Sequence, residues 1–331
     1  MIQLSIIVPV YNVEKYLAKC LDSLLQQDLT PNEYEILVID DESPDGSRAI
    51  AEQFAAEHEH IRVINQKNLG LGGARNTGIT HARGKYLMFV DSDDYIEPNS
   101  IGKLIDITDK KGLEILRFGY VEEKEDLPVE INHTDEEARI SDTYTGEEFI
   151  AERMRVGCYA WVLVIRTKLL MENNLYFVHH RYYEDTEWFP RVLLKTERIA
   201  DCDKVVYHYL QRKGSITKAT DMNKKGKIVE DKLLLIDHLQ ELEKSTNHIG
   251  AKDWFNMMLA HLVVSIVNFS ITHLPVSVKE IKKKLLCKTD LFPLCGKRVS
   301  KPLKRKIRIL NTSINAYIIT RKIYYLLKWG L

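Results

Sequence analysis

The sequence predicts an α/β fold, in which a doubly wound, mostly parallel sheet flanked by helices is followed by a helical extension. Short apolar segments alternate with segments of helical periodicity over residues 3–90, as strands and crossover helices do. Two of these apolar segments end directly in acidic turns. From about Lys224 onward only helical periodicity remains. We therefore expect a sheet-containing domain over residues 1–220 and a helical, basic region over residues 221–331.

The composition is that of an ordinary globular protein. Of the 331 residues, 45% are hydrophobic and 28% are charged, which suffices for one large domain and a smaller one. The five cysteines show no CxxC spacing and no zinc-type cluster, so reduced thiols in a cytoplasm are expected. The apolar run at the N-terminus lacks a basic region and a cleavage site, and it is interpreted as a strand rather than a signal peptide.

The predicted elements alternate along the first two thirds of the chain. Strands are predicted over 3–9, 35–39, 62–65, 85–90, 113–121, 158–165 and 205–209. Helices are predicted over 14–27, 47–58, from the glycine-rich segment at 68–76, and over 98–111, 144–155 and 186–195. The initial βαβαβαβ order is typical of parallel strands joined by right-handed crossovers.

The strand over 85–90 ends in Asp91, Ser92, Asp93 and Asp94. Three neighbouring carboxylates repel one another, and a divalent cation would neutralise them because hard cations take oxygen ligands. Ligands of open α/β sheets bind beyond the carboxyl ends of strands, so the position suits such a site. The alternative is a solvated turn with an Asp capping the next helix, and for Asp94 this alternative stays open.

The segment Gly70-Leu71-Gly72-Gly73-Ala74-Arg75 was compared with the dinucleotide fingerprint GxGxxG. That fingerprint requires glycine where Arg75 stands and follows the first strand rather than the third. NAD binding is therefore not predicted. We expect the glycines to let the backbone approach a phosphate or a sugar, with an ordinary helix start as the alternative.

The C-terminal region is strongly basic. Residues 279–331 contain 15 Lys and Arg against Glu280 and Asp290, a net charge of +13, and the preceding residues carry −13. The stretch 254–273 is apolar enough for a membrane span, but a polar stripe of His261, Ser265, Asn268 and Thr272 favours an amphipathic helix.

A second amphipathic stretch, over residues 303–329, follows. It combines a basic cluster at one end with aromatic residues, namely Tyr317, Tyr324, Tyr325 and Trp329. This pattern predicts peripheral contact with the anionic cytoplasmic leaflet of the inner membrane. A solvated basic face is the alternative.

Five blocks together resemble glycosyltransferase family 2. They are VPVYN (8–12), DDESPDGS (40–47), NLGLGGARNTG (68–78), FVDSDD (89–94) and YED (183–185). Their order and spacing match over about 215 residues of the chain. The resemblance implies an inverting, nucleotide-sugar-dependent enzyme of the GT-A fold, similar to bacterial transferases that build surface polysaccharides, with no nucleic acid partner.

The resemblance also implies a nucleotide-sugar site made of Pro9, Tyr11, Asn12, Asp41, Arg75, Asp91, Ser92, Asp93, Arg212 and Ser215. Asp41 would accept a hydrogen bond from a pyrimidine, most often uracil, so a UDP-sugar is the expected donor. Asp91 and Asp93 would form the DxD motif for Mn²⁺ or Mg²⁺, with Asp93 preferred as the direct ligand. Arg212 and Ser215 would close over the donor diphosphate.

On the acceptor side, the resemblance implies a general base at Asp185, with Glu184 as its rival. Trp161 would offer a ring face to a sugar of a lipid-linked or growing oligosaccharide acceptor. Many members have Trp-Asn-Lys where this chain has Trp161-Val162-Leu163, which puts the acceptor contacts in doubt. A nucleotidyltransferase and a non-catalytic sugar- or nucleotide-binding subunit of a polysaccharide assembly complex are the alternatives.

Overall fold

A computed structural model gives the structure of residues 2–125, 138–212, 222–274, 278–295 and 299–329. The chain forms two compact units. One consists of Met1–Gly146 and Cys158–Lys213, and the other of Glu147–Gly157 and Gly214–Leu331. The segment Glu147–Gly157, which the sequence places in the first domain, thus belongs with the C-terminal helices.

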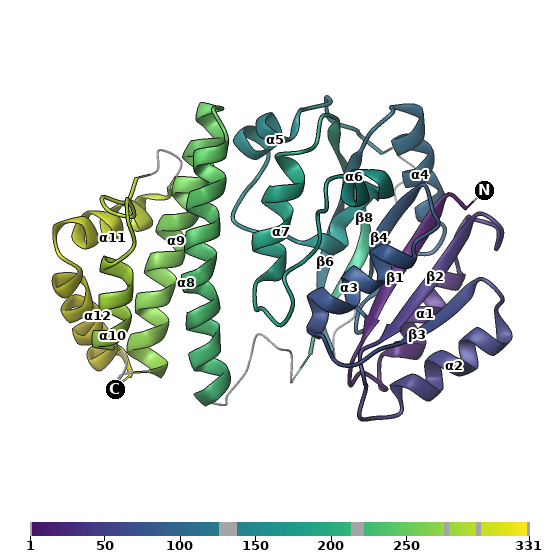
Figure 1. The fold of residues 1–331 in the computed structure, drawn as a ribbon, viewed down its shortest axis with the longest axis horizontal. Coiled ribbons are helices and arrows are strands. Elements are labelled where there is room, and N and C mark those ends of the chain that lie inside the picture. Colours follow the sequence, from purple (N-terminus) through teal and green to yellow (C-terminus); the bar gives the residue numbers. More distant parts are fainter. Residues whose placement is uncertain (1, 126–137, 213–221, 275–277, 296–298, 330–331) are drawn as a thin grey trace. The chain divides into compact units, whose positions relative to one another are not determined.

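The first unit contains an eight-stranded sheet among the described residues, with strand order β3-β2-β1-β4-β7-β6-β8-β5 (Figure 1). Its parallel half comprises β1 (Leu4–Val10), β2 (Tyr34–Asp40), β3 (Ile61–Asn65) and β4 (Tyr86–Phe89). All seven residues of β1 and of β2 are buried, which explains their continuous apolar runs.

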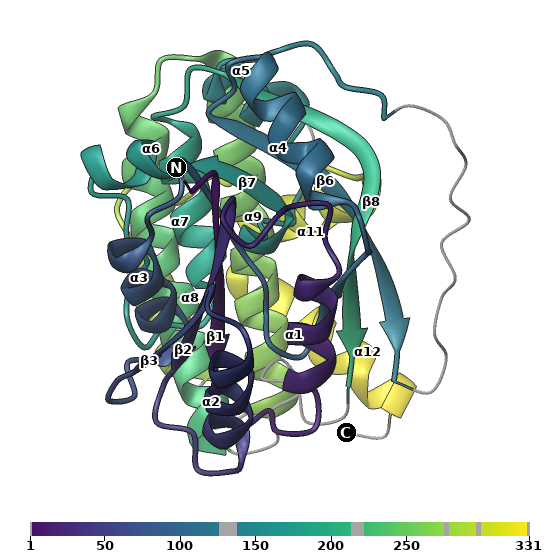
Figure 2. The ribbon, with the colours of Figure 1, turned by 90° about the vertical axis from the view of Figure 1, so that its right-hand side faces the viewer.

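The crossover helices lie on both faces of this sheet. They are α1 (Leu17–Leu25), α2 (Ser47–Glu57) and α3 (Gly70–His81). In Figure 2 α3 lies on one face of the sheet and α1 on the other. The expected doubly wound α/β class is therefore confirmed.

The other half of the sheet is mixed. β7 (Leu163–Arg166) is antiparallel to β4 and to β6 (Ile115–Lys124), whereas β8 (Ile199–Gln211) is parallel to β6, and β5 (Tyr95–Ile96) is antiparallel to β8. The helices of this half are α4 (Ile101–Lys110), α6 (Thr167–Glu172) and α7 (Glu184–Leu193).

Two strand predictions in this half need correction. The strand predicted over 158–165 is wrong in its first part, because Ala160–Val162 form a 3₁₀ turn and β7 begins only at Leu163. The strand predicted over 205–209 begins earlier, at Ile199, where β6 provides backbone partners that the local sequence does not reveal.

The second unit is helical. It contains α5 (Gly146–Glu152), α8 (Met222–Ser245), α9 (Ile249–His273), α10 (Val278–Leu286), α11 (Lys301–Thr312) and α12 (Ile314–Trp329). The helical extension is confirmed, but the single stretch predicted over 303–329 is two helices, α11 and α12.

Among the described residues, α9 is the helix that is long and apolar enough to cross a membrane. In this structure it packs against α8, α10, α11 and α12 as the central helix of its unit. Its predicted polar stripe is half-buried, and two of the four residues, Ser265 and Asn268, have hydrogen-bond partners on neighbouring helices. Ser265 Oγ accepts a hydrogen bond from Lys232 Nζ, and Asn268 Oδ1 accepts one from Tyr317 Oη.

Candidate functional site

The acidic turn directly follows β4, at the edge of the sheet where the parallel strands end. Both aspartates of the DxD motif are paired with arginines. Asp91 Oδ1 accepts a hydrogen bond from Arg75 Nη2 at 2.9 Å, and Asp93 Oδ2 accepts one from Arg212 Nε at 2.6 Å. Burial and the charge of Asp91 raise the pKa of Asp93 despite the nearby Arg212. The cluster therefore favours a neighbouring cation.

Arg75 joins the two acidic motifs. Its side chain is 1% exposed, and besides Asp91 its Nη1 donates to Asp185 Oδ1 at 2.5 Å and to Glu184 Oε1 at 3.1 Å. Burial opposes the guanidinium charge, but Asp185, Asp91 and Glu184 outweigh it and raise the pKa of Arg75. One buried cation thus links the turn after β4 with the start of α7.

Glu184 and Asp185 lie in the first turn of α7, after Tyr183 in the left-handed conformation at φ 64°. Asp185 Oδ2 also accepts a hydrogen bond from the Ala160 backbone N–H at 3.1 Å. Burial and Asp185 raise the pKa of Glu184 to about 7. Burial also raises the pKa of Asp185, although Arg75 counteracts it. Both carboxylates are thus largely buried, held in a fixed orientation and raised in pKa.

Two of the glycines before Arg75 lie close to other atoms of the protein. A Cβ on Gly72 would lie 2.8 Å from the Val178 backbone oxygen, and one on Gly73 would lie 2.3 Å from Leu69 Cβ. The glycines therefore accommodate close packing within the protein, and the expected approach to a phosphate or sugar is not what requires them at these two positions.

Asn76 on the same helix completes this packing. Its side chain exchanges hydrogen bonds with both the N–H and the carbonyl group of Phe177. Helix α3 thereby anchors the segment that leads to α7, and so it positions both Arg75 and the carboxylates that Arg75 binds.

Asp94 has a structural role. It is almost fully buried, and it accepts hydrogen bonds from Tyr207 Oη and from the Leu210 N–H, each at 2.7 Å. The Tyr207 hydroxyl in turn accepts a hydrogen bond from the Asp91 N–H at 3.1 Å. Burial, with Asp91 and Asp93 nearby, raises the pKa of Asp94 to about 9.

The suggestion that Asp94 caps the next helix is therefore wrong, because α4 has Ser100 at its N-cap. Asp94 and Tyr207 instead tie the acidic turn to β8, which leads to Arg212. Sequence reasoning missed Tyr207 because nothing in a strand of alternating tyrosines indicates which hydroxyl faces the acidic turn.

The residues expected around the nucleotide lie at the ends of β1 and β2. Pro9 is buried in β1, Tyr11 is 51% exposed, and Asn12 has a positive φ of 57°. Asp41 Oδ1 accepts hydrogen bonds from Gln66 Nε2 at 2.7 Å and from the Leu69 N–H at 2.8 Å, which fixes the carboxylate. β1 and β2 are neighbours, so these groups share one end of the sheet.

Two other expected residues need comment. Ser92 is buried in the acidic turn, and Ser215 lies outside the described residues.

Trp161 presents little surface to a ligand. It is 5% exposed, and its ring stacks on Tyr159, Tyr207 and Tyr209 at centroid distances of 4.9, 4.4 and 5.5 Å. The expected sugar-binding face of Trp161 is therefore covered by protein side chains in this structure. Of these four aromatic side chains, Tyr159 is the most exposed.

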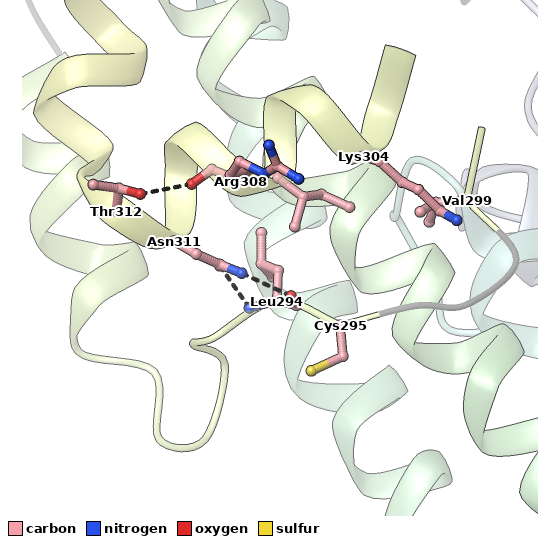
Figure 3. Close-up of a pocket in the computed structure, with 8 residues that line it drawn as sticks. Leu294, Cys295, Val299, Lys304, Arg308, Asn311 and Thr312 are labelled. Atoms are coloured by element: carbon pink, nitrogen blue, oxygen red, sulfur yellow. Dashed lines mark hydrogen bonds between the residues drawn. The ribbon is translucent and has the colours of Figure 1, made fainter. Parts of the chain in front are cut away.

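A separate pocket of ≈430 Å³ lies in the helical unit (Figure 3). Its lining residues are Leu294, Cys295, Val299, Lys304, Ile307, Arg308, Asn311 and Thr312. None of them is acidic, so this pocket does not share the chemistry of the carboxylate site.

The α/β fold thus holds the acidic turn after β4 beside a second acidic pair at the start of α7. The sequence profile of Glycosyl transferase family 2 matches residues 5–169. The chain is also 32% identical over 292 residues to the glycosyltransferase EpsJ of Bacillus subtilis, an alignment that covers 85% of this chain and 81% of EpsJ. The chain belongs to glycosyltransferase family 2, and it is a nucleotide-sugar-dependent glycosyltransferase.

Solved structures agree on the fold. TarS 1–349 of S. aureus in complex with UDP-GlcNAc superposes with a TM-score of 0.68 at 23% identity, covering 99% of this chain and 92% of TarS 1–349. A mannosyltransferase of Pyrobaculum calidifontis, in complex with GDP-Man and Mn²⁺, gives 0.54 at 14% identity, covering 99% of this chain and 88% of that one. The expected GT-A fold is thereby confirmed, and the family membership favours glycosyl transfer over nucleotidyl transfer.

Proposed function

We propose that this enzyme transfers a sugar from a UDP-sugar to a hydroxyl group of a lipid-linked or growing glycan acceptor in polysaccharide biosynthesis, with inversion at the anomeric carbon. The observation that carries the proposal is the Arg75 cluster. It holds the donor-side carboxylate Asp91 next to Asp185, a buried carboxylate with a raised pKa. Donor activation and proton removal can then occur in one site.

At the nucleotide end, Pro9, Tyr11, Asn12 and Asp41 would hold the base. Asp41 is fixed through Oδ1, so its carboxylate is preorganised to accept a hydrogen bond from a uracil N–H. This is the physical argument for UDP. The TarS complex with UDP-GlcNAc supports a uridine nucleotide by analogy of fold.

The chemistry of Asp91 and Asp93 fits a divalent metal, since Mg²⁺ and Mn²⁺ favour carboxylate oxygens and are often completed by substrate phosphates and water. Burial and the neighbouring charge of Asp91 raise the pKa of Asp93, so an added cation would favour its ionised form. When bound, the ion would stabilise the charge that develops on the leaving diphosphate. Arg212, already paired with Asp93, would contribute positive charge at the same place.

Asp185 is the proposed general base. Its two oxygens are oriented by Arg75 and by the Ala160 N–H, and a raised pKa makes it a better proton acceptor than an ordinary aspartate. It would take the proton of the acceptor hydroxyl as that oxygen attacks the anomeric carbon. Glu184 shares Arg75 and remains the rival.

Asp185→Asn and Glu184→Gln distinguish the two carboxylates. A panel of UDP-sugars with Mn²⁺ first identifies the donor through its slow hydrolysis and then an acceptor through transfer. Asp185→Asn should lower transfer by about 10²- to 10⁴-fold, the contribution of a positioned base, while UDP affinity measured by calorimetry stays near that of the wild type. If only Glu184→Gln abolishes transfer, the base is Glu184, and if neither does, the pair is structural.

The metal role has its own test. Asp93→Asn should abolish the increase in UDP affinity that Mn²⁺ produces in the wild type, whereas Asp22→Asn, at an exposed position on α1, should leave it intact. Equal UDP affinity of the wild type with and without Mn²⁺ would contradict the proposal.

A lipid-linked acceptor would bring the reaction to a membrane surface. We therefore also propose a peripheral location at the cytoplasmic face of the inner membrane. The net charge of +13 over residues 279–331 supports attraction to an anionic leaflet.

A further inference from the structure

Helix α12 carries an apolar stripe on its solvent side. Ile319, Ile323, Leu326 and Leu327 are 58%, 53%, 58% and 82% exposed. Their positions follow i, i+4, i+7 and i+8, which places all four on one face of the helix. Isolated exposed apolar residues are ordinary, but four large aliphatic side chains on one helix face form a contiguous patch.

The stripe is not part of the helical core, because α12 contributes a different face to it. Ile314 and Tyr317 are buried, and α12 packs against α9 and α11. The Tyr317 hydroxyl donates to Asn268 Oδ1 on α9 at 3.1 Å, and Arg321 Nε donates to the same oxygen at 3.0 Å. Tyr317, which the sequence suggested as an interfacial aromatic residue, is therefore a core residue of the helical unit.

Exposed cations accompany the stripe. Lys322 is exposed on α12 beside the stripe, whereas Lys328, also exposed, lies eleven positions after Tyr317 and therefore on the opposite face of the helix. On the neighbouring α11 the exposed basic residues are Lys301, Lys304, Arg305 and Arg308. Two of these, Lys304 and Arg308, line the pocket in Figure 3 together with Leu294 and Ile307. The neighbouring helices α11 and α12 thus carry both exposed aliphatic side chains and exposed positive charge.

The combination of apolar side chains and positive charge indicates what binds to the stripe. In a symmetric dimer through α12, a second copy would bring another region of net charge +13 against the first, and like charges oppose that contact. An anionic bilayer offers apolar chains for the stripe and negative headgroups for the cations.

We propose that α12 lies along an anionic lipid surface, with Ile319, Ile323, Leu326 and Leu327 inserted and with Lys322 and the exposed lysines and arginines of α11 at the headgroups. This inference rests on the peripheral location proposed above, but not on the proposed chemistry.

The test is flotation of the full chain with vesicles of phosphatidylcholine alone or mixed with phosphatidylglycerol. The wild type should bind the mixed vesicles and release them at high salt, because screening shortens the range of the attraction. Ile323→Ser combined with Leu327→Ser should weaken binding by about a hundredfold, since each large aliphatic side chain transferred to apolar surroundings is worth at least about tenfold. The control is Ile249→Ser, which replaces another isoleucine, 74% exposed, outside the stripe.

The headgroup contact is tested separately by Lys322→Gln, which should weaken binding about fivefold. Lys328→Gln, on the opposite face of α12, is its control and should change binding less. UDP affinity and thermal stability should be the same in all these variants, so failure of the surface is distinguishable from failure of the catalytic site.

Three results would overturn the proposal. One is equal binding of the wild type to neutral and anionic vesicles, and another is unchanged binding of the Ile323→Ser/Leu327→Ser variant. The third is a wild-type dimer in light scattering that this variant converts to a monomer, because the stripe would then be a contact between copies.

Discussion

Glu184→Gln is expected to stabilise the fold at alkaline pH while leaving it unchanged at acidic pH. Glu184 is largely but not fully buried beside Asp185, and its pKa rises from 4.5 to about 7 although Arg75 is within hydrogen-bonding distance. Ionisation of Glu184 is therefore unfavourable in the folded state. Glutamine has the same shape without the charge and can accept the same hydrogen bond from Arg75.

The sign and size of the effect follow from linkage. Some carboxyl groups have a higher pKa in the folded state than in the unfolded state. Such a group lowers the stability of the protein as the pH rises from its unfolded-state pKa to its folded-state pKa. For Glu184 that window extends from about 4.5 to about 7. This difference between the two pKa values corresponds to roughly 3 kcal/mol in the free energy of unfolding. The variant should gain nothing near pH 4 and approach this gain above pH 7.

The assay is urea unfolding of the wild type and the variant between pH 4.5 and 8.5, with EDTA present so that no metal occupies the site. A matched control is Glu172→Gln on α6, at an exposed position, which should give no pH-dependent difference. A constant difference at all pH values, or a loss of stability at pH 8, would refute the reasoning, because the burial of the charge would then not be the cause.

Three further outcomes are expected in urea unfolding at pH 8. Arg75→Met should cost about 3–5 kcal/mol, since it leaves three carboxylates without their buried cation, and a loss below 1 kcal/mol would contradict that role. Tyr207→Phe should cost about 1–3 kcal/mol because Asp94 loses a buried donor, and it should also weaken UDP binding with Mn²⁺; unchanged values in both would argue against the tie between the acidic turn and β8. Gly78→Ala should cost about 1–3 kcal/mol, because its Cβ would lie 2.2 Å from Ile7 Cγ2; a neutral effect would show that α3 can shift away from β1.

The sequence by itself determined the parallel half of the sheet and the acidic motifs at the strand ends. These features are local, because a short continuous apolar run is typical of a strand that is buried on both faces, and a carboxylate directly after such a strand lies at the end of the sheet. The same holds for the helical C-terminal region and its positive charge, which depend on periodicity and composition alone.

Only the tertiary structure decided how these parts meet. Arg75 binds carboxylates 16 and 110 positions away in the chain, and no local pattern encodes a contact between elements so far apart. The same limit explains why Trp161 is covered by tyrosines of β8 and why α9 is a core helix. It also explains α12, whose periodicity indicates apolar faces but not which of them the other helices bury, since that depends on the packing of α9 and α11 against it.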